Sequence, residues 1–147
     1  MKIFLASDHR GFELKEKIKG WLTEWGYEYK DMGNFVYDKD DDYPDFIRKA
    51  AEKVSQDPEN AKAIVLGGSG QGEAMAANRY KNVRAAVYYG GVEEIIKLSR
   101  EHNDANILCL GVFFLGENMI KKAVKLWLET PFSGEERHKR RINKIDS

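Results

Sequence analysis

Short apolar runs alternate with longer amphipathic segments along the chain, and this alternation restricts the fold more than any other feature. Runs of about 4–8 residues have the length and composition of buried strands, and they cover residues 2–7, 27–32, 61–67, 84–89 and 106–111. The segments between and after them have apolar residues at helical spacing, and they cover residues 12–25, 44–54, 72–79, 92–102 and 117–129. Strand–helix alternation favours right-handed crossovers and a parallel sheet covered on both faces. The sequence therefore predicts an α/β fold, a three-layer α/β/α sandwich with about five strands.

Length and composition favour one soluble domain over residues 1–147. The chain has 147 residues, of which 42% are hydrophobic, and this is enough to bury a core of its own. Its formal net charge is zero, which argues against a nucleic-acid partner because nucleic-acid-binding domains are normally strongly basic. No apolar run approaches the roughly 20 residues that cross a bilayer, and the apolar start of the chain is too short for a signal-peptide core. We expect a cytoplasmic protein with no membrane partner, and the single cysteine, Cys109, fits a reducing compartment.

A glycine-rich loop follows the third predicted strand and precedes a predicted helix. It reads GGSGQG over residues 67–72 and contains Gly67, Gly68, Gly70 and Gly72. Glycine lets a ligand approach backbone N–H groups closely, and the helix N-terminus behind the loop adds unpaired donors and a partial positive charge. In an open parallel sheet, ligands bind beyond the carboxyl ends of the strands, where this loop lies. The loop is therefore suited to hold an anion or a developing oxyanion.

Glu73 restricts the kinds of ligand that this loop can hold. A Walker loop needs Lys and then Ser or Thr after its last glycine, and the dinucleotide fingerprint counted from Gly68 needs a glycine where Glu73 stands. A carboxylate would also repel a phosphate, so nucleotide binding is disfavoured. A carboxylate beside an oxyanion cradle instead suits proton abstraction next to a carbonyl. The alternative is a tight turn in which Glu73 is only a favourable acid in the first helical turn, and the loop alone does not separate these two interpretations.

The three histidines all lie in polar surroundings. His9 follows the first predicted strand together with Asp8, so a parallel sheet brings both to the edge that carries the glycine loop. His102 precedes the last predicted strand, and the topology does not assign it to that edge. Each histidine also has an ordinary interpretation, as a turn residue, a helix cap or, for His138, part of a solvated basic tail.

The C-terminal segment is basic and contains Arg137 and Arg141, four residues apart and therefore on one face if it is helical. Two guanidinium groups on one face form a forked receptor for a phosphate. The alternative is a solvated basic helix, with or without a nucleic-acid partner, and the zero net charge of the chain weakens the version with nucleic acid.

The sequence does not predict a metal site. Metal-ligand spacings such as H-x-x-x-H and C-x-x-C are absent. The acidic run of residues 38–43 starts like a calcium loop, but Tyr43 stands where the turning glycine belongs and Lys49 where the bidentate glutamate should be. We expect this run to be a solvated loop.

Several motifs together resemble the ribose-5-phosphate isomerase B family, which also contains the galactose-6-phosphate isomerase subunits. They cover nearly the whole chain in order and read SDHRGFELK, DYPDF, GGSGQGEAMAANR, SREHNDANILCLG and RHKRRINKI. The resemblance implies a Rossmann-like α/β/α sandwich with a C-terminal helix, without a metal or nucleotide cofactor. It also implies dimers or tetramers with active sites between subunits. The implied reaction interconverts ribose 5-phosphate and ribulose 5-phosphate through an enediolate.

The resemblance also implies how individual residues act. This chain resembles the branch in which the base is a glutamate, here Glu73, rather than a cysteine at the position of Gly67. The glycine loop presents N–H groups to the enediolate, Ser69 helps to move the hydroxyl proton, and His102 opens the sugar ring with Asp8 as its assistant. The implied substrate-binding residues are His9, Tyr43, Gly68, Gly70, Gly72, Asn103, Arg137, His138 and Arg141.

The resemblance implies that some of these residues contact the sugar and others contact the phosphate. Tyr43 and Asn103 position the sugar. His9, Arg137 and Arg141 grip the phosphate, with both arginines reaching across from a partner subunit.

One departure from the family pattern concerns the phosphate. Many members carry a phosphate-binding arginine after the last strand, where this chain has Phe113. The loss of one charge-assisted contact would weaken phosphate binding by about 1.5–3 kcal/mol. Either Arg10 or another cation compensates, or the substrate is a hexose 6-phosphate or an unphosphorylated aldose. A non-catalytic sugar-phosphate-binding module is the alternative outside the enzymes.

Overall fold

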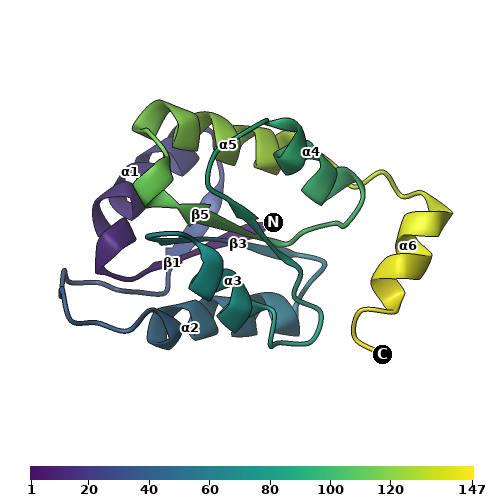
Figure 1. Cartoon of the computed structure of the whole chain (residues 1–147), viewed down its shortest axis with the longest axis horizontal. Helices are drawn as coiled ribbons and strands as arrows, with labels where there is room; N and C mark the ends of the chain where they lie inside the picture. The colour runs from purple at the N-terminus through teal and green to yellow at the C-terminus, as the bar shows by residue number, and fades with distance from the viewer.

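The computed structural model describes residues 1–147 and contains a five-stranded parallel sheet with helices on both faces (Figure 1). The strands are β1 (Lys2–Ser7), β2 (Glu28–Asp31), β3 (Ala61–Gly67), β4 (Ala85–Tyr88) and β5 (Ile107–Gly111). Their order across the sheet is β2-β1-β3-β5-β4, and every neighbouring pair is parallel. The helices are α1 (Phe12–Glu24), α2 (Tyr43–Gln56), α3 (Gln71–Ala77), α4 (Glu94–Glu101), α5 (Glu117–Glu129) and α6 (Glu136–Asn143). The predicted Rossmann-like α/β/α sandwich is therefore confirmed.

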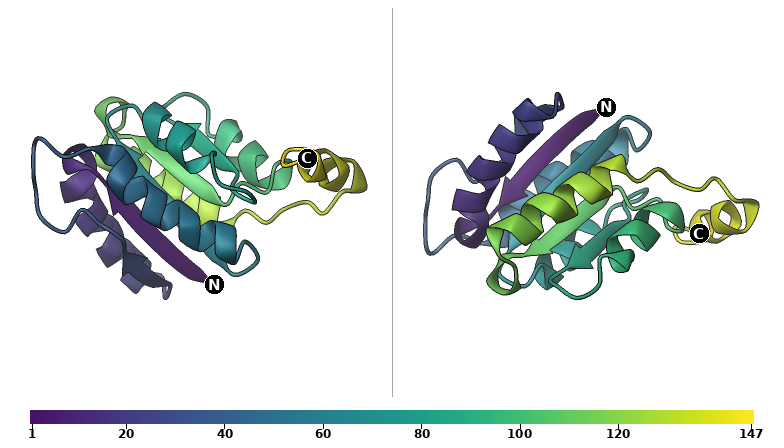
Figure 2. Two further views of the ribbon diagram at one scale, coloured as in Figure 1. Left: turned by 90° about the horizontal axis from the view of Figure 1, so that it is seen from below. Right: turned by 90° about the horizontal axis from the view of Figure 1, so that it is seen from above.

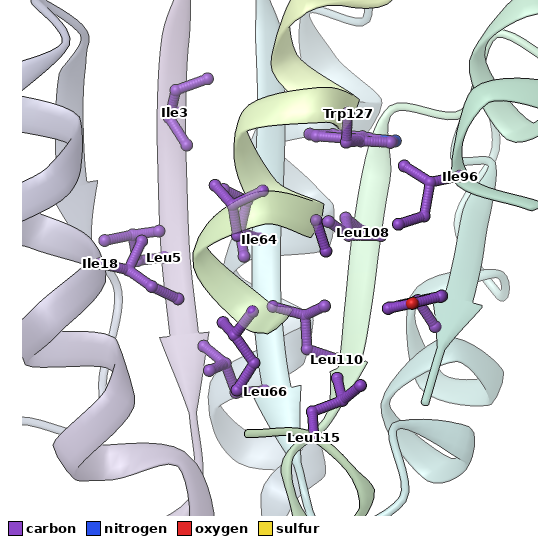
Figure 3. Packing of buried hydrophobic residues seen from close by; sticks show 14 of the residues in the cluster. Ile3, Leu5, Ile18, Ile64, Leu66, Ile96, Leu108, Leu110, Leu115 and Trp127 are labelled. Atoms are coloured by element: carbon purple, nitrogen blue, oxygen red, sulfur yellow. The ribbon is translucent and has the colours of Figure 1, made fainter. Parts of the chain in front are cut away.

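Both faces of the sheet are buried because the central strands have consecutive rather than alternating apolar residues over positions 3–6, 63–67 and 107–111. On one face, α1, α4 and α5 pack over a cluster of large side chains, and Figure 3 shows Ile18, Ile96 and Trp127 meeting the strands there. On the other face, α2 and α3 pack over a cluster rich in alanine, which includes Ala63 and Ala74. Small side chains let a helix lie close to a sheet. The start of α3 is consequently held against the end of β3.

The carboxyl ends of the three central strands lie side by side. Ser7 is in register with Leu66, and Gly67 with Gly111. The loop after β1, the glycine loop after β3 and the turn at Val112–Phe114 after β5 therefore share one edge of the sheet. This confirms the prediction that Asp8 and the glycine loop lie at the same edge.

A chain of polar contacts holds the loop between β2 and α2 against the end of β1. Lys15 is fully buried, its Nζ lies 2.8 Å from Asp31 Oδ1, and it also donates to the backbone oxygen of Asn34. Asn34 Nδ2 donates to Asp41 Oδ2 at 2.8 Å, and Asp41 Oδ1 accepts from the His9 backbone N–H at 3.1 Å. The acidic run is thus not wholly solvated as predicted. Most of it is exposed, but Asp41 points inward because it bonds to His9 and Asn34.

We expect Asp31→Ala to lower the free energy of unfolding by about 3–5 kcal/mol, because it leaves the buried Lys15 ammonium without its carboxylate. Urea denaturation measures this loss. The double variant Asp31→Ala/Lys15→Met, which removes both charges, should be considerably more stable than Asp31→Ala alone. A loss below about 1 kcal/mol in the single variant would contradict the assignment of Asp31 as the necessary partner of Lys15.

Helix α6 stands apart from the sandwich, beyond the edge opposite the glycine loop, in all views (Figures 1 and 2). It is attached through His138, which is buried and whose ring stacks on His102 with centroids 4.3 Å apart. The predicted C-terminal helix is thus present, and its arginines project from a separate element. None of the helices combines the length and apolar composition that a membrane span requires.

Candidate active site

A cleft of about 380 Å³ opens at the carboxyl edge of the sheet, above the glycine loop. This volume lies within the usual range for a small-molecule site. The side chains and backbone that line it come from the loops after β1, β3 and β5 and from the starts of α2 and α3. The lining residues are Asp8, Arg10, Tyr43, Gly68, Ser69, Gly72, Glu73, Phe113 and Phe114.

Glu73 lies in the first turn of α3 and points back toward the end of β3 rather than into solvent. It is only 4% exposed. A Cβ atom placed on Gly67 would overlap the Glu73 carboxyl group, so this carboxyl group occupies the space that a side chain at position 67 would need. Burial raises the pKa of Glu73 above its ordinary value, and the negative charge of Asp8 raises it further, whereas the N–H of Glu73 itself acts in the opposite direction. A buried carboxyl group with a raised pKa in a cleft is suited to accept a proton.

The glycine loop presents backbone donors beside this carboxyl group. The N–H groups of Gly68, Ser69 and Gly70 make no hydrogen bond within the chain, whereas the N–H of Gln71 donates to Ser69 Oγ at 3.2 Å. Gly70 has a φ of 78°, in the left-handed region that favours glycine, and it turns the chain from the loop into α3. Unpaired N–H groups on a fixed loop are the donors that a developing oxyanion requires.

Asp8 and Tyr43 complete the wall of the cleft around Glu73. Asp8 is 5% exposed, and its Oδ1 accepts a hydrogen bond of 3.0 Å from the Arg10 backbone N–H. Burial raises the pKa of Asp8 above its ordinary value. Tyr43 lies directly against Gly72, since a Cβ atom there would be 2.5 Å from the tyrosine hydroxyl oxygen. The cleft therefore holds two shielded carboxyl groups and a phenol hydroxyl within one small volume.

His9 lies beside the cleft rather than in its lining. Its Nδ1 is 2.7 Å from Asp41 Oδ1, which leaves Nε2 as its other hydrogen-bonding atom. Asp8, His9 and Asp41 form a group of potential metal ligands whose donor atoms all lie within 4.8 Å of one another. Two of the three donors are already paired with each other, so the group has the contacts of a hydrogen-bonded cluster.

The remaining predicted site residues lie at the opposite edge of the sheet. His102 and Asn103 follow α4 and precede β5, while Arg137, His138 and Arg141 belong to α6. The five residues of β5, at about 3.3 Å each, separate this edge from the glycine loop by about 15 Å. Within one chain, the structure therefore divides the predicted site into a Glu73 group and a His102 group.

The cleft also contains residues that the sequence analysis did not assign to the site. The sequence indicates Arg10 only as one possible replacement for a missing arginine, and it does not indicate Phe114. Only their position after a strand end could have indicated these two residues in the sequence. Arg10 lies two residues after Asp8 at the end of β1, and Phe114 lies three residues after the end of β5. Residues in such loops line the ligand-binding edge of a parallel sheet.

Cys109 lies in β5, is fully buried and is not paired in a disulfide. Burial raises the pKa of its thiol, and the nearby charge of Glu73 adds to this. We expect the native protein to react with a thiol reagent such as 5,5′-dithiobis(2-nitrobenzoic acid) only after denaturation, because the thiolate is the reactive form. Absorbance at the thionitrobenzoate band follows the reaction, and rapid labelling with loss of activity would contradict a purely structural Cys109.

Comparison with known proteins gives agreement over nearly the whole chain. The family model described as Ribose/Galactose Isomerase matches residues 3–145. Ribose-5-phosphate isomerase B of Mycolicibacterium paratuberculosis is 41% identical over 143 residues, which cover 97% of this chain and 88% of that protein. The putative sugar phosphate isomerase YwlF of Bacillus subtilis is 39% identical over 145 residues, which cover 99% of this chain and 95% of that protein.

Solved structures give the same result. Ribose-5-phosphate isomerase B from Mycoplasma genitalium with bound ribulose-5-phosphate superposes with a TM-score of 0.93 at 40% identity, covering 98% of this chain and 93% of that one. The Clostridium thermocellum ribose-5-phosphate isomerase B superposes with a TM-score of 0.91 at 41% identity, covering 99% and 95%. A shared fold, a matching family model and relatives at this level of identity lead to one conclusion. The chain belongs to the ribose/galactose isomerase family, a family of aldose–ketose isomerases.

Proposed function

We propose that the protein interconverts ribose 5-phosphate and ribulose 5-phosphate through an enediolate, with Glu73 as the base. One observation carries this proposal: the buried Glu73 carboxyl group and the residues Gly68 and Ser69, whose N–H groups are unpaired, line the same cleft. An enediolate mechanism needs a base and oxyanion donors around the same two carbons. The names of the relatives support a pentose phosphate as the substrate.

In the proposed reaction, Glu73 removes the proton from C2 of the open-chain aldose. Negative charge then develops on the former carbonyl oxygen at C1, and the N–H groups of the glycine loop stabilise it. The Ser69 hydroxyl relays a proton from the oxygen on C2 to the oxygen on C1. Glu73 returns its proton to C1, which gives the ketose and restores the carboxylate.

We further propose that each active site takes its Glu73 group from one subunit and its His102 group from a second copy of the chain. The separation of these groups within one chain supports this, because His102 cannot open a sugar ring that lies beside Glu73 of the same subunit. Arg137 and Arg141 are exposed on α6, which projects from the sandwich (Figure 2). The stacked His138 fixes the orientation of the His102 ring. A homodimer is the smallest assembly that completes both sites, and a tetramer built from two such dimers would serve equally.

We also propose that the protein is cytoplasmic, because its single cysteine, Cys109, is an unpaired thiol and this fits a reducing compartment. Residues 1–147 form one domain in this proposal, and α6 contributes residues to the active site of the neighbouring subunit rather than to a separate activity.

Deuterium exchange tests the mechanism directly. Isomerisation of ribose 5-phosphate in D₂O should incorporate deuterium at C1 of ribulose 5-phosphate, because a proton carried by a carboxylate exchanges with solvent. Nuclear magnetic resonance measures the incorporation. Turnover with complete retention of the C2 hydrogen, as in a direct hydride shift, would contradict the enediolate.

Phe113 favours a second candidate, an isomerase of a hexose 6-phosphate or of an unphosphorylated aldose. Values of kcat/KM for ribose 5-phosphate, allose 6-phosphate and free ribose separate the candidates. No preference for the pentose phosphate would contradict the first. Thermal stabilisation by ribose 5-phosphate without any turnover would instead indicate a binding module.

The raised pKa of Glu73 predicts the pH dependence of the reaction. A general base acts in its deprotonated form, so kcat/KM should increase with pH along an acid limb whose midpoint lies above the ordinary carboxyl value of 4.5. Asp8→Asn removes a negative charge that raises the pKa of Glu73, so it should move this limb to lower pH. Asp45→Asn, at an exposed carboxylate on α2, should leave the limb unchanged. An Asp8→Asn limb at the wild-type position would show that the two carboxyl groups are not coupled.

A further inference from the structure

Arg10 stacks on Phe113 at the mouth of the cleft. Its guanidinium carbon lies 4.5 Å from the centroid of the Phe113 ring. Both side chains cover Gly68, since a Cβ atom placed there would be 2.7 Å from Phe113 Cε2 and 3.2 Å from Arg10 Cδ. The Phe113 backbone N–H donates to the Gly68 oxygen at 3.0 Å, which fixes the ring relative to the glycine loop. A flat guanidinium group is therefore held over the loop by an aromatic face.

The charge of Arg10 has no partner within the chain. Arg10 takes part in none of the ion pairs of the structure. It is also the only cationic side chain in the lining of the cleft, to which Asp8 and Glu73 contribute two carboxyl groups. Without Arg10, the charged side chains that one chain contributes to the cleft would all be carboxylates, which repel an anionic substrate.

We infer that Arg10, oriented by Phe113, binds the anionic end of the substrate and makes the site prefer phosphorylated over neutral sugars. The inference rests on the proposed function, which puts the sugar in this cleft. Stacking occupies one face of the guanidinium group and leaves its N–H edge available for two phosphate oxygens. Phe113 thus stands where many family members have an arginine, and its ring holds a charge that comes from the loop after β1 instead.

Steady-state kinetics with ribose 5-phosphate test this inference. Arg10→Ala should raise KM by about 10- to 100-fold, because a bidentate charge-assisted contact is lost, while kcat changes by less than about threefold. Phe113→Leu keeps an apolar side chain but removes the stacking face, so it should raise KM by a smaller factor. Arg10→Ala should leave KM for free ribose unchanged. A wild-type KM for ribose 5-phosphate in Arg10→Ala, or equal increases for the two sugars, would overturn the inference.

Two further variants separate binding from a structural effect. Phe113→Arg in the Arg10→Ala background returns a guanidinium group to the same part of the cleft, and it should restore most of the lost affinity. Arg48→Ala is the matched control, because Arg48 is an exposed arginine on α2 that pairs with Asp45. It should leave KM at the wild-type value. A double variant no better than Arg10→Ala would contradict binding through the charge.

Titration with inorganic phosphate distinguishes failure of this inference from failure of the proposed function. Isothermal titration calorimetry should give an affinity about tenfold weaker for Arg10→Ala than for the wild type. If the wild type does not isomerise ribose 5-phosphate but this difference is present, the proposed function fails and the anion site at Arg10 stands. If the wild type is active and the variant has unchanged KM and unchanged phosphate affinity, only the inference about Arg10 fails.

Discussion

Glu73→Gln should lower kcat for ribose 5-phosphate by about 10²–10⁴-fold, the usual contribution of a positioned general base. Glutamine keeps the size of the side chain in the space beside Gly67, but it cannot accept a proton at neutral pH. KM should change little, because the substituted group acts on the reacting carbons and not on the phosphate. Coupled or direct spectrophotometric assays of ribulose 5-phosphate formation measure the loss. A variant with a rate near that of the wild type would show that another group is the base.

Stability measurements show whether this loss is catalytic. A carboxyl group whose pKa is raised on folding binds its proton more tightly in the folded state, so the free energy of unfolding falls as the pH rises through the raised pKa. Glu73→Gln removes this cost. The variant should therefore have a higher Tm than the wild type at about pH 7, and the difference should disappear near pH 4, where both states hold the proton. A lower Tm at neutral pH would assign the loss of activity to folding.

Glu94→Gln is the matched control for the alternative interpretation, in which Glu73 is only a favourable acid in the first turn of its helix. Glu94 is also an acid in the first turn of a helix, α4, but it is exposed and lies outside the cleft. If Glu73 acted only through the helix dipole, both substitutions would cost similar small amounts of stability and neither would affect kcat. We expect full activity for Glu94→Gln.

The main elements of the fold could be predicted because local patterns determine them. Apolar runs bounded by turns indicated every strand, and a parallel sheet then requires that residues after strand ends share one edge. This reasoning correctly brought Asp8 to the glycine loop. It could not assign His102, because a residue that precedes a strand lies at the other edge, and only the family resemblance linked His102 to Glu73.

The orientation of individual side chains could not be predicted from the sequence. Glu73 points toward Gly67 because the alanine-rich face of the sheet lets α3 lie close to β3, and this depends on residues from several elements. Asp41 turns inward because it accepts hydrogen bonds from His9, 32 residues away in the sequence, and from Asn34 in its own loop. The stacking of Arg10 on Phe113 joins two strand-end loops in the same way. Such contacts depend on tertiary packing, which the local propensities of residues do not predict.

Mixing two inactive variants should recover activity if each site is shared between subunits. Glu73→Gln and His102→Ala homodimers each carry one substitution in both of their sites, and each should be strongly impaired. In a mixed dimer, one site combines both substitutions and the other contains neither. Random assortment makes about half of the dimers mixed, and each of these has one intact site, so the mixture should reach about one quarter of the wild-type activity.

Differently tagged chains, refolded together and purified through both tags, give the mixed dimer alone, which should have about half of the wild-type activity per dimer. The control pair is Glu73→Gln with Ser69→Ala. Both residues belong to the group around the glycine loop, so every site of that mixed dimer keeps one substitution and no recovery should occur. Purified mixed dimers of Glu73→Gln and His102→Ala without recovered activity would contradict the shared site. We expect recovery for Glu73→Gln with His102→Ala and none for Glu73→Gln with Ser69→Ala. This result would mean that association of two chains brings together groups that lie about 15 Å apart within one chain. A rearrangement within a single chain could not explain it, because it would not make the two pairs behave differently.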